Sequence, residues 1–237
     1  MTTDPALTRQ VLLARLRTLE LSASQDSARS RQWEEIRSSA TEDLSGPTSL
    51  DQWVNQLRSE LQRLGGELRT AASLNDIPSA VVDLARESRY KRIALGDDRL
   101  LEEIRLADQL NNFVEFRLLD KRSASNPKDH AGPALAQCQL GITGCQAIIA
   151  ETATIVLDHQ GFGGRSLSLL PECHLVLAQR SQVFGRLRDW WNATQPGRDN
   201  LPTCRTFITG PSRTADIEKV LVTGVHGPLR LVVILAG

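Results

Sequence analysis

The chain has 237 residues, of which 41% are hydrophobic, and its 28 Lys and Arg residues balance 28 Asp and Glu residues. This length and hydrophobic content suffice for one sizeable core, so we expect a soluble globular protein of one domain with an N-terminal extension. The balanced charge provides no general positive field, which argues against unspecific binding to nucleic acid or to an anionic membrane.

The first 49 residues are expected to stand apart from the main domain. Residues 7–21 carry aliphatic side chains at helical spacing on one side and arginines on the other, which predicts an amphipathic helix. Residues 22–49 are rich in Ser, Thr, Arg and Glu, which is typical of a linker. An α/β domain is then expected over residues 50–237. The helix of residues 7–21 suits packing on its own domain and on a partner subunit equally well.

Helical and strand patterns alternate from Leu50 onward. Helices are predicted at 50–64, 76–88, 98–110, 133–138, 145–150, 181–193 and 212–220. Strands are predicted at 67–71, 92–95, 113–118, 140–143, 153–157, 174–178, 205–209 and 230–236. This alternation predicts an α/β fold with an open, mostly parallel sheet flanked by helices. The short surroundings of the strands at 153–157 and 174–178 leave room for one antiparallel edge or hairpin.

The spacing of the cysteines bears on which cofactors the chain could bind, and the length of its apolar runs bears on its location in the cell. The four cysteines, at positions 138, 145, 173 and 204, form no C-x-x-C pair, and the closest two are separated by six residues. This spacing fits neither a compact iron–sulfur motif nor a zinc ribbon, so we expect reduced cysteines and no metal or cofactor in this chain. The sequence has no apolar run of ~18 to 20 residues and no signal-peptide core, so we expect a cytoplasmic protein without a membrane span.

The segment G-I-T-G-C-Q-A-I-I-A-E-T-A-T-I-V at 141–156 contains two polar candidates for a site. Thr143 stands where a strand is expected to end, at the edge where parallel sheets bind ligands. Glu151 is the only carboxylate between Asp129 and Asp158. In an apolar setting its pKa would be raised, and it could act as an acid, a base or a nucleophile. The alternative is a buried glutamate that bonds to Thr or backbone groups.

The segment G-F-G-G-R-S-L-S-L-L-P-E-C-H at 161–174 is rich in glycine. Gly163, Gly164 and Arg165 are typical of a loop that cradles an anion, because small residues let backbone N–H groups converge and the guanidinium adds a bidentate donor. The spacing matches neither the Walker motif nor the dinucleotide-binding G-x-G-x-x-G. His174 opens the next strand and is either a site residue or a hydrogen-bonded core histidine.

The segment T-F-I-T-G-P-S-R-T-A-D-I-E-K-V-L-V-T-G-V-H-G-P at 206–228 predicts a strand that feeds a helix. The strand enters a turn at Gly210, and a helix is expected to start near Ser212 or Thr214. A helix N-terminus leaves N–H groups unpaired and carries partial positive charge, so a phosphate or carboxylate could bind beside Arg213. The alternative is that Ser212 and Thr214 only cap the helix, since both are common N-cap residues.

His226 stands between two glycines before the last strand and is the best general acid–base candidate by residue type. Its alternative role is to hold the loop by hydrogen bonds. Segments expected at the carboxyl edge of the sheet are 143–144, 161–165, 210–214 and 224–227. Together they would form one polar pocket for a small anionic ligand, with Arg165 and Arg213 as its cations.

These blocks together resemble one protein family. T-G-P-S-R-T-A-D-I-E followed by G-V-H-G-P is similar to the C-terminal signature of the lactate utilization protein C family, the LUD-domain proteins, and the likeness covers roughly residues 75–237. It implies the fold of ribose-5-phosphate isomerase, glucosamine-6-phosphate deaminase, the CoA transferases and 5-formyltetrahydrofolate cyclo-ligase. The family usually has a glycine where this chain has Ala153, whose Cβ occupies space that a ligand could approach. The family arginine matches Arg165, but the family Asn near Gly164 is missing.

The resemblance implies a component of the L-lactate utilisation system that supports oxidation of L-lactate to pyruvate together with two iron–sulfur partner subunits. The clusters are expected in those partners and not in this chain. One alternative is a stand-alone CoA transferase-like enzyme for a phosphorylated sugar, an acyl-CoA or a folate, with Glu151 or His226 reacting. Another is a non-catalytic interaction subunit that docks through residues 7–21. The sequence leaves open whether the chain forms a homo-oligomer.

Overall fold

The structure is a computed structural model, and it describes only part of the chain. The described residues are 49–113, 115–120, 132–158, 164–194, 202, 204–215, 221–223 and 227–237. The predicted helix of residues 7–21 lies outside them, so the division into an N-terminal segment and an α/β domain stays a prediction. Among the helices that the structure describes, none has the length and apolar character needed to cross a membrane.

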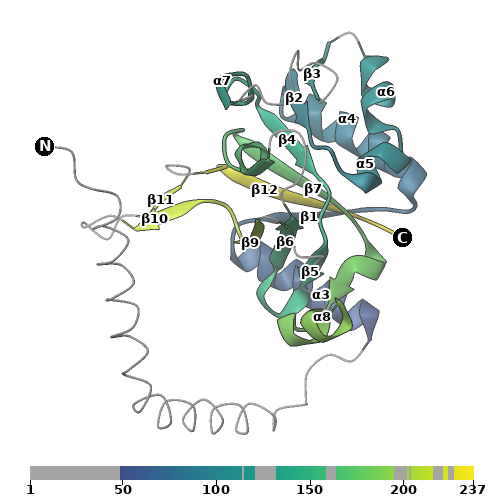
Figure 1. Ribbon diagram of the computed structural model, residues 1–237, viewed down its shortest axis with the longest axis vertical. Coiled ribbons are helices and arrows are strands. Elements are labelled where there is room, and N and C mark those ends of the chain that lie inside the picture. The colour runs from purple at the N-terminus through teal and green to yellow at the C-terminus, as the bar shows by residue number, and fades with distance from the viewer. Residues whose placement is uncertain are drawn as a thin grey trace, which may run out of the picture. The chain divides into compact units, whose positions relative to one another are not determined.

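Six strands form the central sheet (Figure 1), in the order β1 (Glu67–Ala71), β12 (Arg230–Ala236), β7 (Cys173–Gln179), β4 (Leu140–Thr143), β2 (Arg92–Leu95) and β3 (Arg117–Leu119). Every neighbouring pair in this sheet is parallel. The predicted open parallel sheet is therefore confirmed. The strand expected at 113–118 is displaced, because Phe113 directly follows the C-cap residue Asn112 of a helix and pairing begins only at Arg117.

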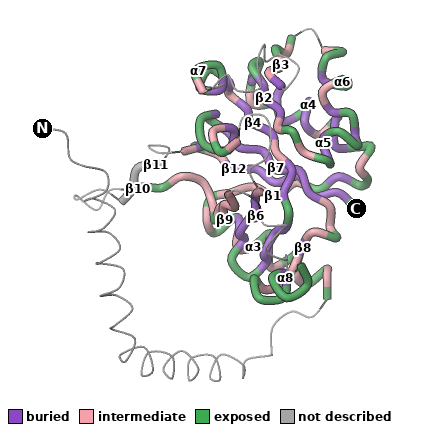
Figure 2. Tube along the Cα trace, in the orientation of Figure 1, coloured by how far each residue is buried: buried purple, intermediate pink, exposed green. Residues whose placement is uncertain are grey.

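Helices cover both faces of this sheet. On one face lie α4 (Ile77–Glu87), α5 (Arg99–Glu103) and α6 (Leu106–Asn111), and on the other lies α3 (Leu50–Arg63). Alternate residues of β12 enter the two cores: Val232 and Ile234 join the first, and Leu231 and Val233 join the second. The central strands are thus buried on both faces (Figure 2), which explains their nearly continuous apolar sequences.

Three of the predicted helices are shorter than expected or interrupted. The helix predicted at 98–110 is divided into α5 and α6, because Arg105 takes a left-handed backbone with φ 49°. The helix predicted at 133–138 is the four-residue α7 (Gly132–Leu135). Only the end of the helix predicted at 181–193 forms, as α8 (Leu187–Thr194), after a short turn and the two-residue strand β8 (Val183–Phe184).

A second sheet has four strands, in the order β8, β5 (Ala147–Ile149), β6 (Thr154–Asp158) and β9 (Arg205–Thr209). The pairs β5–β6 and β6–β9 are antiparallel, so the hairpin expected near 153–157 belongs to a separate sheet and does not interrupt the central one. The helix predicted at 145–150 is wrong. Its β-branched Ile148 and Ile149 lie in β5, where they are fully buried.

The helix predicted at 212–220 is also wrong where the structure describes it. Strand β10 (Arg213–Ala215) pairs with strand β11 (Leu221–Thr223) in an antiparallel hairpin, while residues 216–220 lie outside the described residues. The cap-forming residues Ser212 and Thr214 indicated a helix start. The β-branched residues Thr214, Val222 and Thr223 instead favour extended backbone, and this preference prevails.

Candidate functional site

The direction of the chain reverses between two neighbouring strands of the central sheet. From β2 the chain proceeds to β3 at one edge, whereas from β4 it proceeds to β7 on the other side. Strands β2 and β4 are themselves paired. Ligands of open parallel sheets bind outside the carboxyl ends of the strands at such a switch point. The loops 96–98 after β2 and 144–146 after β4 flank this place, which we call the switch-point cleft.

Two cavities meet in the switch-point cleft. The smaller, of about 40 Å³, lies between the two loops and is closed by Gly164 and Leu167 of the short helix η5 (Gly164–Ser168). The larger, of about 610 Å³, has a size typical of small-molecule sites. Its polar lining residues are Asp97, Asp98, Arg99, Glu103, Gln146, Asp158, Gln179 and Gln182. Among these described lining residues, Arg99 is the one cation.

Asp98 lies at the centre of the cleft and lines both cavities. Its Oδ1 accepts a hydrogen bond of 2.9 Å from the backbone N–H of Leu100 and so caps α5. Burial raises the pKa of Asp98, and the nearby charges of Asp97 and Glu102 raise it further, against the lowering effect of that N–H donor. Its carboxyl group lies directly over Gly144, where an added Cβ would overlap all three carboxyl atoms.

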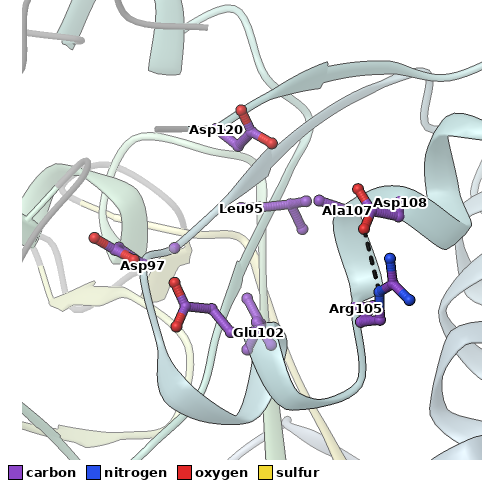
Figure 3. Close-up of a pocket in the computed structure, with 9 residues that line it drawn as sticks. Leu95, Asp97, Glu102, Arg105, Ala107, Asp108 and Asp120 are labelled. Atoms are coloured by element: carbon purple, nitrogen blue, oxygen red, sulfur yellow. Dashed lines mark ion pairs between the residues drawn. The ribbon is translucent and has the colours of Figure 1, made fainter. Parts of the chain in front are cut away.

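A third cavity, of about 320 Å³, lies beside the cleft at the carboxyl ends of β2 and β3. Figure 3 shows the carboxylates of Asp97, Glu102 and Asp120 around it. Arg105 forms an ion pair of 3.5 Å with Asp108 at its side (Figure 3). The described residues of this edge therefore carry more carboxylates than cations, in contrast to the cationic pocket expected from the sequence.

Asp158, at the end of β6, contributes to the cleft but is already paired. Arg205 of β9 donates two hydrogen bonds to its carboxylate, of 2.5 and 2.7 Å, and both side chains are largely buried. The guanidinium also lies 5.0 Å from the ring centroid of Trp190. The hydrogen bonds that Arg205 donates to the Asp158 carboxylate raise the pKa of Arg205. This pair closes one wall of the cleft with little net charge.

Two of the residues predicted from the 141–174 region meet in the structure. Thr143 ends β4, and its Oγ1 lies 2.9 Å from Nε2 of the buried His174. His174 is thus the hydrogen-bonded core histidine of the two roles considered. Gly164 adopts φ 46° and lines the smaller cavity, whereas Arg165 is exposed and lines none of the three described cavities. Gly163 lies outside the described residues.

The C-terminal motif does not converge on the carboxyl edge of the central sheet. The Ser212 N–H donates a 3.0 Å hydrogen bond to the carbonyl of Pro228, which lies just before β12 and hence at the amino edge. Gly210, at φ 83°, packs against Leu64, and Arg213 donates from Nη2 to the Leu64 carbonyl. The expectation that segment 210–214 joins Thr143 at one edge is therefore wrong.

Other predicted site residues are accounted for as follows. Glu151 is exposed in a short turn (η4, Ala150–Thr152), and its Oε1 accepts a 3.2 Å hydrogen bond from the Leu187 N–H, so the apolar setting expected for it is absent. The Thr214 side chain and His226 lie outside the described residues. The roles predicted for these residues stay predictions.

The cysteines near the cleft are poor nucleophiles. Cys145 is buried, and burial raises its pKa far above neutrality. Burial also raises the pKa of Cys173 to about 11. Both are therefore thiols at neutral pH and unsuited to thiolate chemistry. The described residues contain no group of three or more His, Cys, Asp or Glu side chains placed to hold a metal ion.

Sequence reasoning missed Asp97, Asp98 and Gln146 as cleft residues. The signal available was Gly96-Asp97-Asp98 directly after a predicted strand, the position where a helix cap is expected. The sequence pattern did not reveal the order of the strands, and only that order places the loop after β2 beside the loop after β4.

Comparison with known proteins shows which proteins the chain is similar to. The LUD domain family matches residues 54–236. Lactate utilization protein C 1 of Bacillus mycoides (strain KBAB4) is 32% identical over 191 residues, which cover 78% of this chain and 79% of that protein. Lactate utilization protein C of Deinococcus radiodurans is 41% identical over 113 residues, covering 47% of this chain and 51% of that protein.

One solved structure shares the fold. The crystal structure of a DUF162 family protein from Deinococcus radiodurans superposes with a TM-score of 0.60 at 24% sequence identity. The match covers 81% of this chain and 100% of that chain. It supports the arrangement of sheets and helices described above.

Proposed function

The chain belongs to the LUD domain family, and we propose that it is a component of an L-lactate utilisation system. In this proposal it supports the oxidation of L-lactate to pyruvate, while iron–sulfur partner proteins take up the two electrons released. The observation that carries the proposal is the 32% identity, over 78% of the chain, to a protein named lactate utilization protein C 1.

The switch-point cleft supports a role in binding a small molecule. Its larger cavity, of about 610 Å³, exceeds what a three-carbon hydroxy acid requires. It also combines hydrogen-bond acceptors with the exposed cation Arg99. A cytoplasmic location is part of the proposal. It is supported by the four cysteines, which are free thiols and suit a reducing compartment.

A stand-alone enzyme of the same fold is the second candidate, and the size of the same cavity favours it. Such an enzyme would turn over a phosphorylated sugar, an acyl-CoA or a folate without partners. The carboxylates that line the cleft argue more strongly against phosphorylated and CoA substrates, which carry two or more negative charges, than against a monocarboxylate, whose single charge Arg99 can balance. We therefore place this candidate second.

A growth experiment tests the proposed function. A strain of the source organism that lacks this chain is expected to lose growth on L-lactate as the sole carbon source while retaining growth on pyruvate. Supplying the wild-type chain should restore growth on lactate. Undiminished growth of the deletion strain on lactate, with no second copy of the gene present, would contradict the proposal.

A further inference from the structure

The carboxyl group of Asp98 has one oxygen that accepts a hydrogen bond from the protein, and Asp98 lines both cavities of the switch-point cleft. Oδ1 accepts the N–H of Leu100, and this bond fixes the orientation of the group. The described residues donate no hydrogen bond and form no ion pair to Oδ2. Oδ2 therefore keeps its capacity to accept a hydrogen bond from a ligand in the cleft.

Gly144 makes this position of Asp98 attainable. The carboxyl group occupies the space that a Cβ at residue 144 would need, so any side chain there would force the carboxyl group to shift from this position. Gly144 does not have a positive φ, so its backbone conformation does not itself demand glycine. The contact with Asp98 is therefore the feature that excludes a larger residue at this position.

The charges around the cleft decide which group of a ligand approaches Asp98. Asp97 and Glu103 line the larger cavity beside it, and Asp158 is neutralised by Arg205. A ligand carboxylate placed against Asp98 would meet like charge, whereas a hydroxyl group would donate a charge-assisted hydrogen bond to Oδ2. Arg99, which is next to Asp98 in the chain, is exposed and lines the larger cavity, so it can bind the carboxylate of a ligand.

We infer that Asp98 binds the hydroxyl group of a 2-hydroxy acid through Oδ2, and that Gly144 keeps its carboxyl group in the position to do so. This inference rests on the proposed function, since it assigns the binding residue for the substrate of that system. Asp98 is then the residue that distinguishes a 2-hydroxy acid from the same acid without a hydroxyl group. Arg99 holds the carboxylate end.

Calorimetric titration of the full chain with L-lactate and with propionate tests the inference, because the two ligands differ only in the hydroxyl group. The wild-type chain should prefer L-lactate by about tenfold or more, the usual contribution of a hydrogen bond to a charged group. In Asp98→Asn, the Leu100 N–H holds the amide oxygen and turns the NH2 group toward the ligand in place of the acceptor. The preference should then fall to about threefold or less.

Gly144→Ala provides a second, independent variant, because it displaces the carboxyl group without removing it. It should lose the preference for L-lactate as Asp98→Asn does. Two matched controls should keep it: Asp83→Asn, an exposed carboxylate on α4, and Gly132→Ala, where an added Cβ meets no atom within 4 Å.

The outcomes separate this inference from the proposed function. Equal binding of L-lactate and propionate by the wild-type chain, or an undiminished preference in Asp98→Asn, would overturn the inference. If growth on L-lactate still requires the chain in that case, the proposed function stands and only the role of Asp98 falls. Loss of the preference in the controls as well would also overturn it, since the effect would then not be specific to the cleft.

Discussion

Burial changes the acid–base behaviour of Asp98, and this has a consequence for stability. Its pKa is raised in the folded state above the unfolded value of about 3.9. The folded chain therefore binds more protons than the unfolded chain between these two pKa values, so its free energy of unfolding falls as the pH rises through that window.

We predict that Asp98→Asn removes this pH dependence while retaining the cap on α5. As the pH rises above the unfolded pKa of about 3.9, the wild-type chain should lose stability relative to the Asn variant. At lower pH the free energy of unfolding of the two chains should change with pH in the same way. Urea unfolding at a series of pH values measures the difference. A constant difference across the series would contradict the raised pKa.

Ala153 is a strained residue in the turn between β5 and β6. It adopts φ 49° and ψ 40°, the left-handed region, and is completely buried. Replacing it by Val should lower the free energy of unfolding by about 2 kcal/mol or more, because β-branched residues rarely adopt this backbone and the site is full.

The change Ala153→Gly serves as the comparison. Relief of the left-handed strain, about 1 kcal/mol, should offset the loss of a buried methyl group of similar value, so stability should change by less than about 1 kcal/mol. Chemical denaturation of both variants tests this, and equal effects of Val and Gly would refute it. The family glycine expected at this position thus corresponds to a backbone conformation that the structure shows.

At the scale of single residues, the sequence predicted where a residue lies within a strand or turn better than whether its side chain is buried. Thr143 was expected at the end of a strand and is found there. Glu151 was expected in an apolar setting because its neighbours are apolar, yet the turn at residues 150–152 directs it to the surface. Local sequence does not show in which direction a turn residue points, since that depends on the strands on either side.

Helix α3 is held at its start by a capping box. The Ser49 hydroxyl accepts the Gln52 N–H, and the Gln52 side chain accepts the Ser49 N–H. Ser49→Ala should lower the free energy of unfolding by about 1 kcal/mol. Ser59→Ala, on an exposed position inside the same helix, should not lower it. Equal losses in thermal unfolding of the two variants would contradict the capping role.

The pair Asp158–Arg205 ties β6 to the edge strand β9. Removing one partner leaves a largely buried charge uncompensated, so Asp158→Asn should cost about 2–3 kcal/mol of stability. In a double-mutant cycle, adding Arg205→Met to Asp158→Asn should recover about 1 kcal/mol or more. Strictly additive effects would show that the ion pair contributes nothing of its own.

At the scale of elements, the predictions failed where a short β-branched run competed with helix signals. Residues 145–150 and 212–220 were both predicted as helices, but the structure has strand β5 within the first range and strand β10 within the second. Strand β5 is stabilised by pairing both with its hairpin partner β6 and with the more distant β8, where Ile148 pairs with Val183. Strand β10 is stabilised by pairing with β11. The long amphipathic helix at 50–63 needs no such partner, which is why its bounds were predicted almost correctly.

At the scale of the whole molecule, alternation predicts the parallel sheet but not its strand order. Adjacent strands β12 and β7 are separated by 50 residues or more in sequence, and the second sheet combines β5 and β6, which precede β7 along the chain, with β8 and β9, which follow it. The switch point between β2 and β4 follows only from this order. The candidate site therefore moves from the C-terminal motif to the loops after β2 and β4.

The most direct test of this account is lactate-dependent dye reduction by the assembled complex of this chain with the two iron–sulfur partners. We predict that reduction requires the wild-type chain, falls about tenfold or more with Asp98→Asn, and persists with Gly132→Ala. Reduction that proceeds undiminished without the chain would contradict the account, and the stand-alone enzyme would then become the leading interpretation.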